Sequence, residues 1–228
     1  TLRKSSVKCF STWKLSAQTF ALGKNILAIS LKFSYISMEM YFTLSSSLVL
    51  VIKLNVLCFN IESIEELHVI HQLAQQENKI ASVCFRINPD VEAHTHKHIR
   101  TGLAEDKFGI DWNRTIEVIQ LAQTMPNIHF KGLHFHIGSQ ITNMDDFKDL
   151  CLRINELQEQ LDANGLRAEM INVGGGLGVD YHQPQQNPIP DFHAYFQTYA
   201  TYLQLREGQT LHFELGRAIV AQCGTLVT

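Results

Sequence analysis

The sequence predicts an α/β fold, a partial (β/α)8 barrel of the TIM type in which parallel strands alternate with helices. From residue 55 onward, apolar runs of strand length alternate with stretches of helical periodicity. Most of these apolar runs end in a polar or glycine-rich motif, and barrel enzymes build their active sites at the carboxyl ends of strands. The 228 residues are 45% apolar and 18% charged, a composition that supports a sizeable buried core.

The strands are expected where short apolar runs stop at turn residues or polar motifs. The second run, for example, ends at Asn88-Pro89, and a long polar loop then extends to Ile110. The expected strands are residues 56–60, 81–87, 128–137, 170–173 and 211–214.

The helices are expected where apolar residues recur at helical spacing between recognisable end signals. Ser63 caps the first helix and Glu66, three residues later, forms a capping box with it. The second helix ends before Pro126, and Gly165 stops the third. The expected helices are residues 64–76, 112–124, 145–164 and 192–205.

Residues 1–54 differ from the rest and are treated as a separate, atypical N-terminal segment, interpreted as frameshifted or disordered sequence. They are rich in Ser, Lys, Phe and Leu and show no clear period. Residues 36–52 are apolar but too short and too interrupted for a membrane span, and no signal peptide follows the basic start. Residues 55–228 form the predicted barrel domain.

The bulk composition excludes several partners. A net charge of −3 gives no electrostatic basis for binding nucleic acid, and no membrane association is expected. Five cysteines without a paired pattern fit thiols in a reducing cytoplasm better than a disulfide framework.

The run Gly174, Gly175 and Gly176 follows the fourth strand. Glycines let backbone N–H groups approach an anion closely, and phosphate is the natural ligand. The spacing is not that of a dinucleotide fingerprint. A tight turn without a ligand is the equally open alternative.

Glu214-Leu215-Gly216-Arg217 follows the fifth strand. Arg217 can form a bidentate pair with phosphate or carboxylate, and Glu214 can hold a ring nitrogen in its protonated form. A surface ion pair explains the same residues without any ligand.

His134 and His136 stand two apart on the third strand, so they share a face. The pair suits a metal, or one ring stacked on a flat cofactor with the other as its support, or two satisfied interior histidines. No third ligand stands at convincing spacing, so no metal is predicted. His94, His96 and His98 read as solvated loop histidines rather than as a metal site.

Taken together, residues 55–228 resemble the diaminopimelate decarboxylases, members of the alanine-racemase-like barrel group that uses pyridoxal phosphate. The stretches that carry the resemblance are residues 86–91, 93–96, 101–103, 107–110, 132–140 and 172–178. The fold implied is a pyridoxal-phosphate-binding barrel followed by a β-domain that this chain is expected to lack.

The resemblance implies a role for each motif. His136 would stack on the pyridine ring and Arg86 would lie near it. Glu214 would pair with the pyridinium nitrogen. Phosphate would be bound by Ser139, by the glycines Gly174, Gly175, Gly176 and Gly216, and by Arg217. Arg217 would also meet a substrate carboxylate, and Lys107 would lie at the interface of a homodimer.

Four departures from the family pattern stand out. The family's Schiff-base lysine lies on the first barrel strand in a motif that this chain lacks, and no cysteine here matches the catalytic one of the β-domain. Residues 1–54 do not resemble the early barrel strands. Leu215 stands where the family has proline, which frees φ at that turn.

The implied activity is the decarboxylation of meso-2,6-diaminopimelate to L-lysine and CO2 with pyridoxal phosphate, with this chain an incomplete or inactive fragment truncated at both ends. The alternatives are another basic amino acid decarboxylase of the same group, a metal-dependent barrel hydrolase that uses His134 and His136, and a non-catalytic remnant. The substrate in the first reading is a small amino acid, and the location is the cytoplasm.

Overall fold

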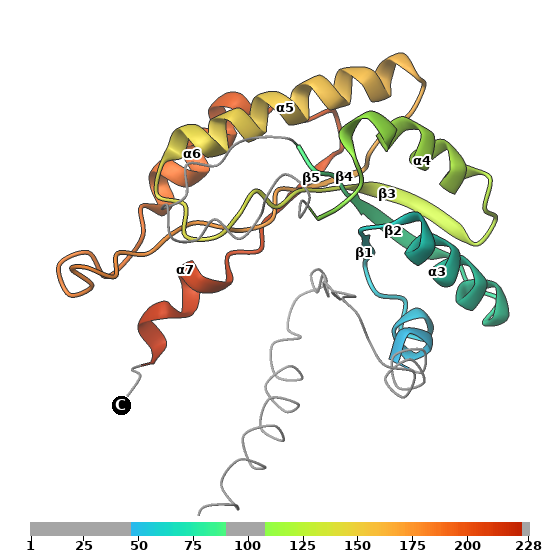
Figure 1. The fold of residues 1–228 in the computed structure, drawn as a ribbon, viewed down its shortest axis with the longest axis horizontal. Helices are drawn as coiled ribbons and strands as arrows, with labels where there is room; N and C mark the ends of the chain where they lie inside the picture. The colour runs from blue at the N-terminus through green and yellow to red at the C-terminus, as the bar shows by residue number, and fades with distance from the viewer. Residues whose placement is uncertain (1–46, 90–107, 225–228) are drawn as a thin grey trace, which may run out of the picture.

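A computed structural model describes residues 47–89 and 108–224 (Figure 1). In these ranges the chain forms a five-stranded, wholly parallel sheet in the order β1-β2-β3-β4-β5. The strands are β1 (Phe59–Ile61), β2 (Ala81–Arg86), β3 (Ile128–His134), β4 (Met170–Asn172) and β5 (Thr210–His212). Sequential strands are therefore neighbours, as the predicted partial barrel requires, and the fold class is confirmed.

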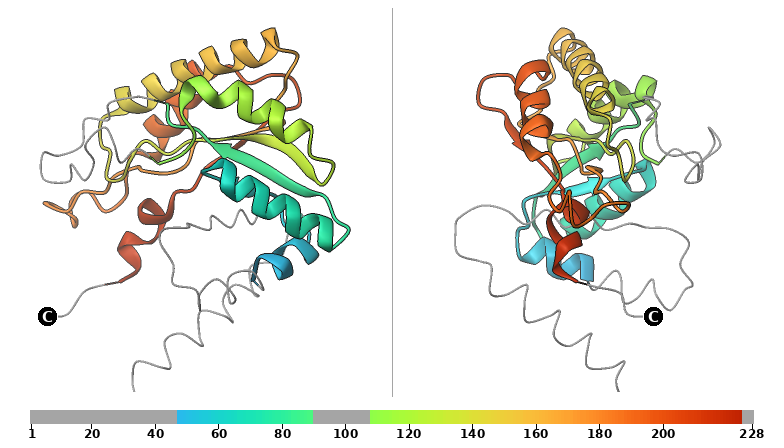
Figure 2. Two further views of the ribbon diagram at one scale, coloured as in Figure 1. Left: turned by 45° about the vertical axis from the view of Figure 1, so that its right-hand side comes forward. Right: turned by 90° about the vertical axis from the view of Figure 1, so that its left-hand side faces the viewer.

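A helix follows most of the strands. The helices are α3 (Ile64–Gln76), α4 (Thr115–Gln123) with the preceding 3-10 turn η1 (Trp112–Arg114), α5 (Met144–Ala163), α6 (Phe192–Tyr202), and α7 (Gly216–Val220) with the 3-10 turn η2 (Ala221–Cys223). Helices α4, α5 and α6 lie together along one side of the strands, whereas α7 lies on the other side (Figures 1 and 2).

The expected start of α3 is confirmed. The Ser63 hydroxyl accepts a hydrogen bond from the Glu66 N–H at 3.1 Å, as an N-cap does. The Glu66 carboxylate reaches back to the N–H of Glu62 at 2.6 Å, one residue before the cap. These two hydrogen bonds fix the conformation of the chain between β1 and α3.

Several expected boundaries were wrong by two or three residues. The first strand begins at Phe59 rather than at residue 56, because the chain bends at Leu57 after a turn in which Asn55 has a left-handed φ of 50°. The third strand ends at His134 rather than at residue 137, because the chain leaves the ladder for a loop that contains Gly138 at φ 149°. The fifth strand ends at His212 rather than at residue 214.

Helix α6 ends at Tyr202 rather than at residue 205, and a buried side chain on α5 explains where it stops. Asn155 donates to the carbonyl of Tyr202 at 2.8 Å and accepts from the N–H of Gln204 at 2.9 Å. These two bonds replace helical hydrogen bonds at that point. The short helix α7 has no counterpart among the expected elements.

The main core lies between the sheet and its helices. It is made of fully buried side chains from alternate strand positions, including Val83, Phe85, Leu133 and Ile171, packed against apolar residues of α3 to α6. Residues 47–53 are helical and add the buried Leu48 and Ile52 to this core. The division of the chain at residue 54 stays a prediction.

No helix in residues 47–89 or 108–224 combines the length and apolarity that a bilayer span requires. The loop histidines His94, His96 and His98, Lys107, and most of residues 1–54 lie outside the described residues.

Candidate functional site

Four polar side chains lie in one row across the sheet, where the strands end. The register pairs Arg86 of β2 with His134 of β3, His134 with Asn172 of β4, and Asn172 with His212 of β5. Partners in register point to the same side of a sheet, so these side chains share the face that the main core does not occupy. The predicted convergence at the carboxyl end of the strands is present.

The carboxylate of Glu214 lies beside this row. Its Oε1 accepts hydrogen bonds from the Asn172 amide at 2.9 Å and from the Asn60 amide at 3.4 Å. Its Oε2 lies 3.5 Å from His134 Nε2. Burial on its own raises the pKa of Glu214, but the imidazole of His134, the Asn172 amide and the charge of His136 lower it to about 2. Glu214 is therefore an anion at neutral pH, with one oxygen already bonded by amides.

Arg217 and Ser139 meet, although 78 residues separate them in the chain. Arg217 Nη2 donates to the Ser139 hydroxyl at 3.2 Å, and Nη1 donates to the hydroxyl of Tyr181 at 2.8 Å. All three side chains are exposed or partly exposed, and the hydroxyls and guanidinium are groups that bind phosphate oxygens. The sequence analysis missed Tyr181, since nothing in its polar loop marked it.

The glycine run is explained first by packing. A Cβ on Gly174 would lie 2.2 Å from the carbonyl oxygen of Phe135, and one on Gly175 would lie 2.2 Å from that of Glu214. At Gly176 the clash is with Gly138 at 2.6 Å, and Gly174 and Gly176 also adopt φ of 69° and 103°. The loop after β4 thus passes so close to the backbone that follows β3 and β5 that residues 174–176 have no room for a side chain.

Gly216 is different. An added Cβ would meet no atom within 4 Å among the described residues, and its φ is not left-handed. Neither crowding nor backbone conformation requires glycine at this position. The space beside Gly216, the first residue of α7, is not filled by any described atom.

The two histidines of β3 and its extension have different surroundings. His134 is 2% exposed: its Nδ1 has no hydrogen-bond partner in the part of the chain that the structure describes, and its Nε2 faces Glu214 Oε2 at 3.5 Å. His136 Nδ1 lies 3.5 Å from the N–H of Gly175, so this ring lies against the glycine run. No group of three His, Cys, Asp or Glu side chains with metal-binding geometry occurs within residues 47–89 and 108–224.

Arg86 is buried and already paired. Its Nη1 donates to Glu62 Oε1 at 2.5 Å, and its guanidinium lies 5.4 Å from the centre of the Phe108 ring. The structure thus ties Arg86 to the end of β1, a partner that the sequence analysis did not identify. The only sequence signal for this pairing was that Glu62 is an acidic residue directly after the first apolar run.

Leu215 forms a tight turn between Glu214 and α7. The N–H of Gly216 donates to the carbonyl of Glu214 at 2.9 Å, which closes an inverse γ-turn around Leu215 at φ −82° and ψ 55°. This φ lies close to the range that proline imposes. The Leu215 side chain is buried in the main core, so the expected loosening of the turn is countered by packing.

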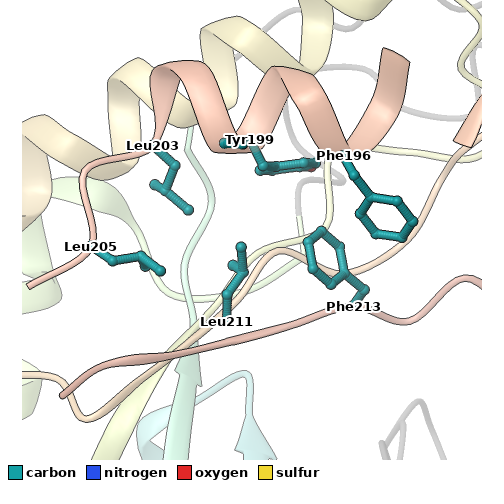
Figure 3. Close-up of a pocket in the computed structure, with 7 residues that line it drawn as sticks. Phe196, Tyr199, Leu203, Leu205, Leu211 and Phe213 are labelled. Atoms are coloured by element: carbon teal, nitrogen blue, oxygen red, sulfur yellow. The ribbon is translucent and has the colours of Figure 1, made fainter. Parts of the chain in front are cut away.

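One apolar cavity lies away from all of these residues. It has a volume of about 330 Å³ and lies between α6 and β5, lined by Phe196, Tyr199, Ala200, Leu203, Leu205, Leu211 and Phe213 (Figure 3). The rings of Phe196 and Phe213 meet edge to face, 5.1 Å apart. No residue of the polar row lines it, so it is not part of the candidate site.

Comparisons with known proteins agree with this geometry. The model of the family described as "Pyridoxal-dependent decarboxylase, pyridoxal binding domain" matches residues 24–221. A diaminopimelate decarboxylase of Bacteroides thetaiotaomicron is 59% identical over 177 residues, which are 78% of this chain and 46% of that protein. A diaminopimelate decarboxylase of Haemophilus influenzae is 42% identical over 77% of the chain and 42% of its own length.

The fold is also similar to solved structures. In the crystal structure of diaminopimelate decarboxylase from Helicobacter pylori complexed with L-lysine, the match covers 78% of this chain and 44% of that one. The TM-score is 0.69 and the sequence identity is 33%. The chain therefore spans less than half the length of these relatives.

Proposed function

This chain belongs to the pyridoxal-dependent decarboxylases, and we propose that it is the cofactor-binding part of a diaminopimelate decarboxylase. The reaction would remove one carboxyl group of meso-2,6-diaminopimelate as CO2 and leave L-lysine. The observation that carries the proposal is that an anionic Glu214 and, three residues later, an Arg217 bonded to Ser139 both follow the carboxyl end of β5. The similarity to curated diaminopimelate decarboxylases supports the choice of substrate.

The donor set fits pyridoxal phosphate. A phosphate needs hydrogen-bond donors and positive charge, which the Ser139 hydroxyl and the Arg217 guanidinium supply, and Gly216 leaves room for a close approach. The backbone of Gly174, Gly175 and Gly176 would complete the phosphate site. His136, which lies against this run, would stack on the ring.

Glu214 would accept a hydrogen bond from the protonated ring nitrogen. Its Oε1 accepts from Asn172 and Asn60 and its Oε2 lies 3.5 Å from His134 Nε2, so the carboxylate is held in one orientation. Because its pKa is about 2, Glu214 stays charged at neutral pH and favours a protonated ring. Arg86, one strand away from His134 in the same row, would lie near the ring.

When bound, pyridoxal phosphate supplies the electron-accepting ring that takes up the electron pair left as the bond between Cα and the carboxyl carbon breaks. The chain's own residues would orient the ring, keep its nitrogen charged and hold its phosphate. A proton replaces CO2 on Cα, so the atoms of the substrate equal those of L-lysine and CO2. Arg217 would also bind a carboxylate of the substrate.

We further propose a homodimer in the cytoplasm. Buried Cys58, Cys84 and Cys151 are free thiols, which suits a reducing compartment. A metal-dependent hydrolase has no supporting ligand cluster in the described residues and is not pursued. Another basic amino acid decarboxylase is the competing substrate assignment.

The test measures decarboxylation with the longest protein that contains this chain. Meso-diaminopimelate, L-lysine, L-ornithine and L-arginine are supplied separately with pyridoxal phosphate, and CO2 and the amine products are quantified. We expect CO2 and L-lysine in equal amounts from meso-diaminopimelate alone. In Glu214→Gln, the loss of a charged hydrogen-bond acceptor would lower kcat about 10- to 100-fold.

Two outcomes contradict the proposal. CO2 released from L-ornithine or L-arginine but not from meso-diaminopimelate would refute the substrate. Turnover that does not require pyridoxal phosphate would refute the chemistry. Borohydride reduction of the 228-residue chain with pyridoxal phosphate, followed by peptide mass spectrometry, would locate any lysine that binds the cofactor covalently.

A further inference from the structure

We propose that Gln140 is a positioning residue that fixes the loop after β3 to the loop after β4, and thereby sets the geometry of the phosphate site. The inference rests on the function proposed above. Gln140 stands directly beside Ser139 in the sequence.

The side chain of Gln140 is bound at both ends to the backbone of one residue in the other loop. Its Oε1 accepts from the N–H of Val179 at 3.2 Å, and its Nε2 donates to the carbonyl of Val179 at 2.5 Å. The amide thus bonds to Val179 as a neighbouring strand's backbone would. Val179 is 5% exposed and Gln140 is half-buried, so these bonds are partly shielded from water.

The two bonds extend a short backbone pairing between the same loops. The N–H of Ile141 donates to Gly176 at 2.8 Å, and the N–H of Gly178 donates to Ile141 at 2.8 Å. Ile141 and Leu177 form a parallel bridge there. Gln140 therefore adds a side-chain connection directly beyond the backbone bridge, and the loops are joined on both sides of Leu177.

The backbone of Gln140 adopts an unfavourable conformation to make this connection. Its φ is 62°, a left-handed conformation that a residue with a Cβ rarely adopts. Gly138 is also at positive φ, so Ser139 lies between two unusual backbone positions. The bonds to Val179 hold this conformation in place.

The consequence concerns the groups on either side of the connection. Ser139 precedes Gln140 and accepts a hydrogen bond from Arg217. Gly176 approaches Gly138 so closely that no Cβ fits between them. If the Gln140 amide is lost, Ser139 can shift relative to both Arg217 and the glycine run. The proposed phosphate contacts would then no longer be available together.

The test uses two probes that share the pyridine ring, of which only one carries a phosphate group. The affinities of the 228-residue chain for pyridoxal 5′-phosphate and for pyridoxal are measured by absorbance titration. In Gln140→Gly, which tolerates the left-handed φ but lacks both hydrogen bonds, we expect affinity for pyridoxal 5′-phosphate to fall about 10-fold. Affinity for pyridoxal should stay within about twofold.

Two further variants sharpen the result. Gln140→Glu keeps the acceptor for the Val179 N–H but places an oxygen against the Val179 carbonyl, so it should also lose affinity for pyridoxal 5′-phosphate. Asn78→Gly is the matched control, because Asn78 has a similar φ of 51° but lies in the turn before β2. It should change neither affinity.

The outcomes separate this inference from the proposed function. An unchanged affinity for pyridoxal 5′-phosphate in Gln140→Gly, or an equal loss for both probes, would overturn the positioning role. If the unmodified chain itself does not prefer pyridoxal 5′-phosphate to pyridoxal, the phosphate site is wrong and the proposed function fails. Urea denaturation of each variant shows whether it is folded, and Gln140→Glu replaces Gln140→Gly if the latter is not.

Discussion

The two faces of the sheet carry opposite chemistry, although alternate residues of the same strands make them. Val83, Phe85 and Leu133 are completely buried in the main core under the helices. Their chain neighbours Cys84, Arg86 and His134 point the other way, where Cys84 joins a small separate cluster with Cys58 and Met170. The polar residues of that second face lie at the carboxyl ends of the strands.

One face of the sheet mainly stabilises the fold, and the other carries the polar groups of the candidate site. The helix-covered face buries apolar surface and makes few polar contacts, so it stabilises the fold. The opposite face holds buried or half-buried charges that are costly unless paired. Those charges are bonded to one another and to amides, as Arg86 is to Glu62 and Glu214 is to Asn172.

The largest expected effect is on the helix-covered face. Leu133→Ala should lower the free energy of unfolding by about 2–5 kcal/mol, because it removes buried methyl groups and leaves a cavity in a close-packed core. Urea denaturation of the 228-residue chain measures it. His134→Gln, a substitution of the adjacent residue on the other face, is the comparison. An equal loss in its free energy of unfolding would show that the two faces do not differ in their contribution to stability.

The next effect tests the crowded glycine run against the open Gly216. Gly175→Ala should cost about 1–3 kcal/mol of stability, because its Cβ would lie 2.2 Å from the backbone oxygen of Glu214. Gly216→Ala should cost nothing, since no described atom lies within 4 Å of its Cβ. Thermal unfolding of both variants checks this, and similar melting temperatures would contradict the packing explanation.

The pH dependence of stability tests the charged face. The pKa of Glu214 in the folded chain, about 2, lies below its unfolded value of roughly 4.3. Ionised Glu214 therefore contributes stability above about pH 4.3, and this contribution is lost as the pH falls toward 2.

Glu214→Gln should accordingly be less stable than the unmodified chain at pH 7, and the difference should shrink as the pH falls from about 5 to 2. Urea denaturation over this pH range measures it. Glu117→Gln, at an exposed position of α4, is the control. A difference that is constant with pH would show that His134 and Asn172 do not stabilise the anion.

The smallest effect on stability is expected at Leu215, which lies between Glu214 of the polar face and helix α7. Leu215→Pro should change the free energy of unfolding by no more than about 1 kcal/mol, because proline restricts the unfolded chain but loses part of the buried side chain. The φ of −82° is near the proline range, and the Leu215 N–H donates no hydrogen bond to a described residue. A loss above roughly 2 kcal/mol in urea denaturation would mean that proline distorts the turn.

Much of the fold was predictable because its signals are local. The alternation of apolar runs with helical periodicity led to the parallel sheet, and Ser63 marked the start of α3. The ends of strands were less predictable, since Phe135 and Ile137 continue the apolar alternation of β3 although the strand ends at His134. Whether an apolar residue pairs in a sheet depends on the neighbouring strand, which the local sequence does not contain.

The candidate site was predictable in part. Ser139, His136, the glycine run, Glu214 and Arg217 stood out as motifs, and the structure brings Ser139 to Arg217 and His136 to Gly175. Asn60, Glu62 and Tyr181 were missed, because single polar residues near strand ends or in loops carry no motif; Gln140 lay within the stretch 132–140 but was given no role. Their roles arise from contacts with residues far along the chain, such as Asn60 with Glu214.

By itself, the sequence determined the alternating α/β architecture, the apolar face of each strand and the positions of the motif residues, because periodicity and end signals act over a few residues. Only the tertiary structure decided the register that aligns Arg86, His134, Asn172 and His212, the pairing of Arg86 with Glu62, and the amides that hold Glu214. Register and charge pairing depend on which strands become neighbours, and that follows from packing the whole core rather than from any one segment.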